Sequence, residues 1–130
     1  MNANLQRISP FIGVPYDHFS LFGFNCWSFV AAVYHELLSE DLVEFKLTTG
    51  SAREIASVFS AALASGEHKF RQVEEAQDLD LILFKGRKLH HVGIMIEGRV
   101  AHCSKGAGGV AIQDLKTLEN TFQEWSLWRK

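Results

Sequence analysis

The side chains best suited to chemistry in this sequence are one cysteine and two histidines, Cys26, His91 and His102. Cys26 follows Asn25, a residue type that caps helices, and the free backbone N–H groups at a helix start favour a thiolate. This placement predicts a nucleophile at Cys26 with a lowered thiol pKa. The alternative interpretation is a small buried residue on the apolar side of the helix, because free cysteine is commonly buried.

A predicted hairpin supplies a base for this nucleophile. Glu97 and Gly98 form a two-residue turn signal between two strands, and in that register Gly93 lies opposite His102. His91 and His102 then share one face, on a diagonal of about 7–8 Å between backbone positions. Because Gly93 has no side chain, space is left between the two imidazoles.

The same register turns a second set of side chains towards an apolar layer on the opposite face: Val92, Ile94, Ile96, Ala101 and Cys103. An odd-length loop or a bulge would instead place Cys103 on the face of the histidines. With the two-residue turn, we expect Cys103 to point away from the site.

Together these residues fit a thiol–imidazole catalytic unit. Cys26 attacks, His91 takes its proton, and His102 orients the ring of His91 through the second nitrogen. A neutral imidazole accepts an N–H and fixes the tautomer of its neighbour without adding charge. This chemistry requires no metal or other cofactor. A zinc site built from Cys26, His91, His102 and Cys103 is the alternative, although CxxC and HExxH are both absent.

The remaining candidates carry less information. We expect His90 to face away from its neighbour or to lie at the strand entrance, and His18, His35 and His68 to be solvent-exposed. The glycine-rich segment 104–110 predicts a turn between strands rather than a phosphate site, because no strand-to-helix transition follows it.

Two helices and a sheet must position these side chains. Residues 25–38 predict a helix with an apolar stripe of Cys26, Val30, Val33 and Leu37. Residues 51–66 predict a second helix, with capping-box spacing at its start and a glycine at its end. The first fifteen residues have the character of an irregular lead-in.

After residue 66 the apolar period approaches two, in short segments rich in Val, Ile, Phe and Trp. These predicted strands are 69–73, 79–85, 91–98, 99–104, 109–112 and 124–129. Their connections are too short for parallel crossovers. We therefore expect an α+β fold in which helices cover one face of a meandering antiparallel sheet.

Composition limits the function classes. The chain has 130 residues, 47% of them hydrophobic and 22% charged, which predicts one folded domain over residues 1–130. A formal net charge of −2 lacks the basic excess typical of proteins that bind nucleic acid or anionic membranes. No apolar run predicts a signal peptide or a membrane span, so synthesis in the cytoplasm is expected. Two cysteines are too few for a disulfide framework.

The order of these motifs resembles the NlpC/P60 family of papain-like cysteine peptidases. The resemblance runs from Gly13 to Leu115 through GVPY, NCWSFV, DLILF, HVGIMIEG and VAHCS. It implies a papain-like fold, with Cys26 as nucleophile, His91 as base, His102 as third member and Tyr16 near the nucleophile. It also implies hydrolysis of the γ-D-glutamyl–diaminopimelate amide in peptidoglycan stem peptides.

Three positions depart from the family pattern. Asn25 replaces the usual Asp before the nucleophile, Trp27 stands where many members have Ser, and the preceding glycine pair is reduced to Gly23. The Cys-Trp pair, the short length and the missing signal resemble members associated with phage and prophage tails. That similarity implies tail or secretion-apparatus proteins as partners, and a place in the virion tail or delivery to the periplasm and cell wall.

Two other functions are compatible with the same residues. Related folds perform acyl transfer with the same thiol, so an acyltransferase is one alternative. The other is a tail-assembly or interaction module that retains the site without using it.

Overall fold

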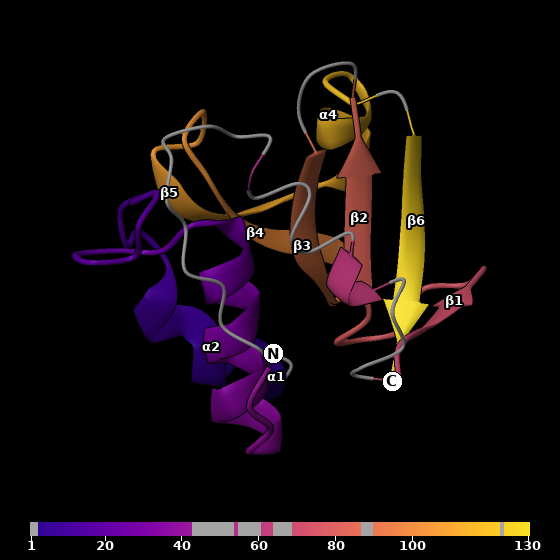
Figure 1. Ribbon diagram of the computed structural model, residues 1–130, viewed down its shortest axis with the longest axis horizontal. Helices are drawn as coiled ribbons and strands as arrows, with labels where there is room; N and C mark the ends of the chain where they lie inside the picture. Colours follow the sequence, from indigo (N-terminus) through magenta and orange to yellow (C-terminus); the bar gives the residue numbers. More distant parts are fainter. Residues whose placement is uncertain (1–2, 43–53, 55–60, 64–68, 87–89, 123) are drawn as a thin grey trace.

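The computed structural model describes residues 3–42, 54, 61–63, 69–86, 90–122 and 124–130. Within these ranges, helices pack against a six-stranded antiparallel sheet (Figure 1). The α+β architecture predicted from the change of period is therefore confirmed.

The predicted helix over residues 25–38 is present as α2, Cys26–Leu38. Asn25 caps it: the Asn25 side chain accepts from the backbone N–H of Ser28, and the Ser28 hydroxyl accepts from the backbone N–H of Asn25. Its buried residues include Cys26, Val30 and Val33 of the predicted stripe. The cap thus sets the start of α2 at Cys26.

The prediction of an irregular lead-in over about the first fifteen residues is wrong for residues 3–11. Residues Ala3–Ile8 form helix α1, followed by a 3-10 helix, η1, over Ser9–Phe11. Ile8 is fully buried, and the Arg7 guanidinium donates to the Glu36 carbonyl in α2. Six residues are too few to give a visible helical period, and contacts with α2 stabilise this turn of helix instead.

Only part of the second predicted helix, 51–66, lies in the described ranges. Glu54 and residues 61–63 are helical there, and Ala62 and Leu63 are buried. The predicted caps at Ser51 and Gly66 lie outside the described residues.

All six predicted strands are found. They are β1 (Arg71–Val73), β2 (Leu81–Lys85), β3 (His90–Ile96), β4 (Arg99–Ser104), β5 (Gly109–Gln113) and β6 (Glu124–Arg129). The sheet order is β1-β6-β2-β3-β4-β5, so the expected simple meander is wrong at one edge. After the short helix α4, Leu115–Glu119, the chain returns and β6 lies between β1 and β2.

An ion pair fastens the inserted strand. The Arg129 guanidinium donates to both carboxylate oxygens of Asp80, each at 2.7 Å, and Asp80 is almost fully buried. Because Asp80 and Arg129 are 49 positions apart, no local sequence pattern predicts this contact.

The predicted turn at Glu97 and Gly98 is confirmed. Both residues have positive φ, 51° and 73°, as a type I′ turn requires, and Ile96 pairs with Arg99 across it. Ile94 pairs with Ala101 in the same ladder, so the two-residue register extends along the hairpin.

The described apolar side chains form two clusters, one on each side of the sheet. The helix-side cluster lies between the sheet and α2 and includes Cys26, Phe29, Val33, Val92, Ile94, Ile96, Ala101 and Cys103. The α4-side cluster consists of Ile82, Phe84, Met95, Val100, Leu118, Phe122 and Leu127. No helix in the described part of the chain combines the length and apolar character needed to cross a bilayer.

Candidate active site

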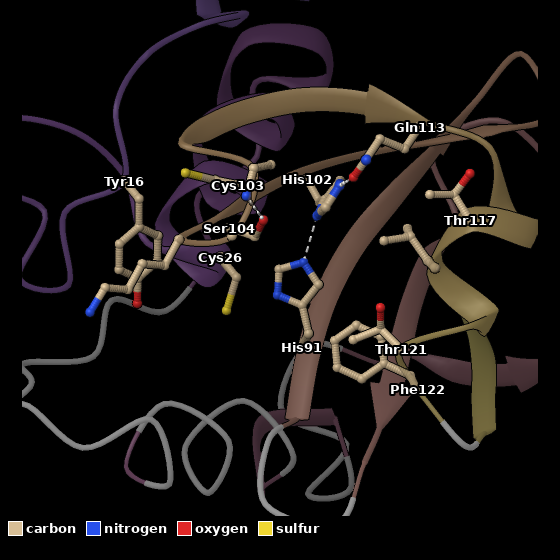
Figure 2. Close-up of a pocket in the computed structure, with 14 residues that line it drawn as sticks. Tyr16, Cys26, His91, His102, Cys103, Ser104, Gln113, Thr117, Thr121 and Phe122 are labelled. Carbon is tan, nitrogen blue, oxygen red and sulfur yellow. Dashed lines mark hydrogen bonds between the residues drawn. The ribbon is translucent and has the colours of Figure 1, made fainter.

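A cavity of about 570 Å³ brings the candidate residues together. Cys26, His91, His102 and Tyr16 all line it, with side chains of α4 along one wall (Figure 2). Cys26 comes from the start of α2 and the two histidines come from β3 and β4. The fold thus brings into one cavity residues that are up to 86 positions apart in the sequence, the separation of Tyr16 and His102.

Cys26 is the first residue of α2 and only 4% exposed. Burial raises the pKa of its thiol to about 12, and backbone hydrogen bonds at Val92, Trp27 and Cys26 itself oppose the rise without cancelling it. The lowered thiol pKa predicted from the helix start is therefore wrong, because loss of water outweighs the backbone N–H groups. The resting thiol is neutral.

Asn25 does more than cap the nucleophile's helix. Its side-chain amide donates to the His18 carbonyl at 2.9 Å, while its carbonyl oxygen accepts from Ser28 N at 2.8 Å. An aspartate could make the second bond but has no N–H for the first. Asn25 thus gives the loop before α2 an attachment to the start of the helix that an aspartate at this position would lack.

The two histidines lie on one face, as the hairpin register predicts. His91 Nε2 and His102 Nδ1 are 2.8 Å apart, and the rings meet edge to face. A Cβ added at Gly93 would lie 2.7 Å from Val100 Cγ1 and 3.2 Å from His102 Cβ. The absence of a side chain at Gly93 therefore leaves the space that the histidine pair occupies.

Aromatic rings hold His91 in place. The His91 ring stacks on the ring of Phe122, with the ring centroids 5.8 Å apart and an angle of 7° between the planes. It also stacks on Phe84, its paired residue on β2, with a centroid distance of 6.1 Å and an interplanar angle of 23°. Burial, with a smaller contribution from neighbouring His102, lowers the pKa of His91 to about 3. His91 is consequently a neutral imidazole, and Figure 2 shows its Nδ1 edge turned towards Cys26.

Gln113 is a site residue that the sequence analysis missed. Its Oε1 lies 2.5 Å from His102 Nε2, on the side of the ring away from His91 (Figure 2). Burial lowers the pKa of His102, and the bond to Gln113 opposes that shift. Gln113 becomes recognisable only through the register of β4 and β5, which pairs His102 with Ala111 and leaves Gln113 diagonal to it on the same face.

Tyr16 reaches the cavity because its segment runs beside the entry to α2. Tyr16 and Phe24 form an isolated parallel bridge, and Asp17 N donates to Phe24 O at 2.9 Å. Partial burial, reinforced by the thiols of Cys26 and Cys103, raises the pKa of Tyr16 to about 12. Its hydroxyl therefore keeps its proton and can donate a hydrogen bond into the cavity.

The expectation that Cys103 lies away from the site is wrong, because Cys103 lines the cavity. The predicted strand register is nevertheless right. Cys103 packs in the helix-side cluster with Ile94 and Ala101, opposite the histidines. Cys26 enters from that same side, so the cavity reaches both cysteines. The Cys103 thiol donates to Phe24 O at 3.1 Å, and burial raises its pKa to about 12.

The less informative candidates lie elsewhere. His35 is exposed and binds Asp41 at 2.9 Å, whereas His18 is half-buried rather than exposed. His68 and the side chain of His90 lie outside the described residues. The predicted glycine-rich turn is present between β4 and β5. In the described ranges, no group of three or more His, Cys, Asp or Glu side chains is arranged to hold a metal ion.

Helices packed on a six-stranded antiparallel sheet, with a cysteine at a helix start beside a strand histidine, define a papain-like α+β protein. Residues 13–127 match the NlpC/P60 family, and the chain belongs to that family. The match extends into β6, beyond the Leu115 boundary expected from the motifs.

A solved structure has the same fold. The crystal structure of the NlpC/p60 domain of peptidoglycan hydrolase SagA is similar with a TM-score of 0.58 and 20% sequence identity, and the alignment covers 98% of each chain. No curated protein matches this sequence.

Proposed function

We propose that this protein is a cysteine peptidase that hydrolyses peptidoglycan stem peptides at the γ-D-glutamyl–diaminopimelate bond. The observation that carries the proposal is the shared cavity of Cys26 and the hydrogen-bonded pair His91–His102. Membership of the NlpC/P60 family and the fold shared with a peptidoglycan hydrolase domain support this substrate class.

In the proposed reaction, Cys26 Sγ attacks the amide carbonyl carbon and its proton passes to His91 Nδ1. His91 then protonates the leaving amine as the C–N bond breaks and a thioester forms on Cys26. A water molecule, deprotonated by His91, hydrolyses the thioester and restores the thiol. His102 keeps the ring of His91 oriented throughout.

The neutral resting state suits a buried site. Burial raises the pKa of Cys26 and lowers that of His91, so charges develop only when the proton moves towards His91 during attack. The neutral Tyr16 hydroxyl, on the same cavity, would donate a hydrogen bond to the bound peptide. This assigns Tyr16 to substrate binding.

The place of action belongs to the same proposal. A phage tail or a contractile secretion apparatus would carry the protein to the periplasm or cell wall, as the Cys26–Trp27 pair and its resemblance to tail-associated members suggest.

Mass spectrometry of purified muropeptides after incubation with the protein tests the proposal. We expect the wild-type protein to release products cut between D-glutamate and diaminopimelate, and Cys26→Ala and Cys26→Ser to release none. Cys103→Ala is the comparison variant, because it also removes a buried thiol of the same cavity but one that is bound to Phe24 O. Circular dichroism of each variant checks the fold.

Two results would contradict the proposal. Uncut muropeptides with folded wild-type protein would favour an interaction module whose site is idle. Transfer of the acyl group to an added amine, without hydrolysis in its absence, would identify an acyltransferase instead.

A further inference from the structure

Three polar side chains form a line across three neighbouring strands of the sheet. His91 lies on β3, His102 on β4 and Gln113 on β5, all facing the cavity (Figure 2). The β4–β5 ladder pairs His102 with Ala111, so Gln113 is its diagonal neighbour. The two contacts in the line are 2.8 Å and 2.5 Å long, and both are hydrogen bonds.

Hydrogen-bond chemistry gives this line a direction. An amide oxygen only accepts, so the contact with Gln113 Oε1 requires a proton on His102 Nε2. A neutral His102 then has a bare Nδ1, which must accept a proton donated by His91 Nε2. A neutral His91 with its proton on Nε2 has a bare Nδ1, and that nitrogen is on the edge turned towards Cys26 (Figure 2).

We propose that Gln113 is a positioning residue that fixes the tautomers of both histidines, so that His91 presents an unprotonated Nδ1 to Cys26. The inference rests on the proposed function, because it assigns the proton on the same base. Gln113 does not touch the nucleophile. It acts through His102, which without an acceptor at Nε2 could carry its proton on either nitrogen.

The burial of the two histidines explains why the acceptor for His102 is a neutral amide, Gln113, and not a carboxylate. His102 is 1% exposed and His91 6%, and burial lowers the pKa of both rings, so the line is neutral at rest. An amide oxygen orders neutral rings without placing a formal charge beside them. When His91 receives the thiol proton, its Nε2–H continues to donate to His102 Nδ1, and the rest of the line keeps its protons.

Nitrogen-15 NMR of the imidazoles in the whole protein at neutral pH tests the assignment directly. Protonated and bare ring nitrogens resonate at different positions, so the spectrum reports each tautomer. We expect His91 and His102 of the wild-type protein both to carry the proton on Nε2. A proton on His91 Nδ1 in the wild-type protein would overturn the proposal, whatever the variants do.

The variants separate positioning from packing. Gln113→Leu removes the acceptor, and we expect mixed tautomers at His91. We also expect alkylation of Cys26 by iodoacetamide to fall by about 10- to 100-fold, the size of the loss when a residue that hydrogen-bonds a metal-ligating histidine is mutated. Gln113→Glu retains an acceptor oxygen and should restore both the His91 tautomer and most of the rate. Peptide mass spectrometry assigns the label to Cys26 rather than Cys103.

Gln72→Leu is the matched control, because Gln72 is an exposed strand residue on β1, outside the cavity, and the chemical change is the same. It should leave tautomers and alkylation unchanged. Wild-type tautomers and rate in Gln113→Leu would refute the proposal. Neither measurement uses peptidoglycan, so failure of the wild-type protein to cut muropeptides would count against the proposed function and not against the role of Gln113.

Discussion

Gly93 and His102 face each other across β3 and β4 so closely that a Cβ added at Gly93 would lie 3.2 Å from His102 Cβ. The same added atom would meet Val100 Cγ1 at 2.7 Å and the Ala101 carbonyl oxygen at 3.0 Å. The hydrogen bond between His91 and His102 thus depends on a glycine that does not itself line the cavity.

Gly93→Ala should therefore destabilise the fold and disturb the histidine pair. We expect a loss of about 1–3 kcal/mol in the free energy of unfolding, as for other insertions into packed interiors. Urea denaturation measures it. Gly106→Ala is the control, because a Cβ there meets nothing within 4 Å, and its effect should stay within about 0.5 kcal/mol. Equal effects of the two variants would contradict this account of Gly93.

The two histidines should differ in how much activity their loss removes. His91→Ala removes the proposed base, and we expect the muropeptide cleavage rate to fall by about 10²- to 10⁴-fold, the usual contribution of a general base. His102→Asn should retain measurable turnover, because an amide oxygen can still accept from His91 Nε2. Steady-state kinetics compare them. If His102→Asn were inactive while His91→Ala kept wild-type rates, the two roles would be reversed.

Asn25→Ala should destabilise the protein by about 1 kcal/mol, the typical cost of losing a helix N-cap, and more if the bond to His18 contributes. Thermal and urea denaturation measure the change. Asp114→Ala provides the control: Asp114 is the N-cap of α4 but makes no side-chain cap hydrogen bond. A control variant as unstable as Asn25→Ala would mean that the cap geometry is not the cause.

Acid should destabilise the fold through the buried histidines. Burial lowers the pKa of His91 to about 3, below its ordinary value near 6.5, so the unfolded chain binds a proton that the folded chain does not. The stabilisation by neutral His91 is complete above about pH 6.5 and declines as the pH falls towards 3, with a limiting slope of about 1.4 kcal/mol per pH unit per proton. Burial of His102 acts in the same direction.

Urea denaturation across this pH range measures the effect. In His91→Gln the unfolding free energy should fall less steeply with acid, because one titrating group is gone. An unchanged slope would show that His91 is accessible to protons in the folded protein.

Chelator treatment should leave both muropeptide cleavage and the melting temperature unchanged, because a thiol and an imidazole perform the proposed chemistry without a Lewis acid. A thiol alkylator should eliminate activity. Stoichiometric zinc by elemental analysis, together with loss of structure in chelator, would instead support a metal site built from the cysteines and histidines.

Much of the candidate site could be predicted from the sequence because its signals are local. A two-residue turn at Glu97 and Gly98 sets the parity of β3 and β4, and that parity puts His91 and His102 on one face. Asn25 marks the start of α2 by hydrogen bonds within four consecutive residues. Both features depend on neighbours along the chain, and both are observed.

The tertiary structure decided the rest, because burial and cross-strand contacts depend on which distant segments pack together. Cys26 has the predicted helix start, yet the surrounding core excludes water and raises its pKa instead of lowering it. Cys103 lies on the predicted face of the sheet, opposite the histidines. Because α2 packs on that same face, the cavity beside Cys26 also reaches Cys103. Gln113 became a partner of His102 only through the pairing of β4 with β5, a register that no turn signal in the sequence specified.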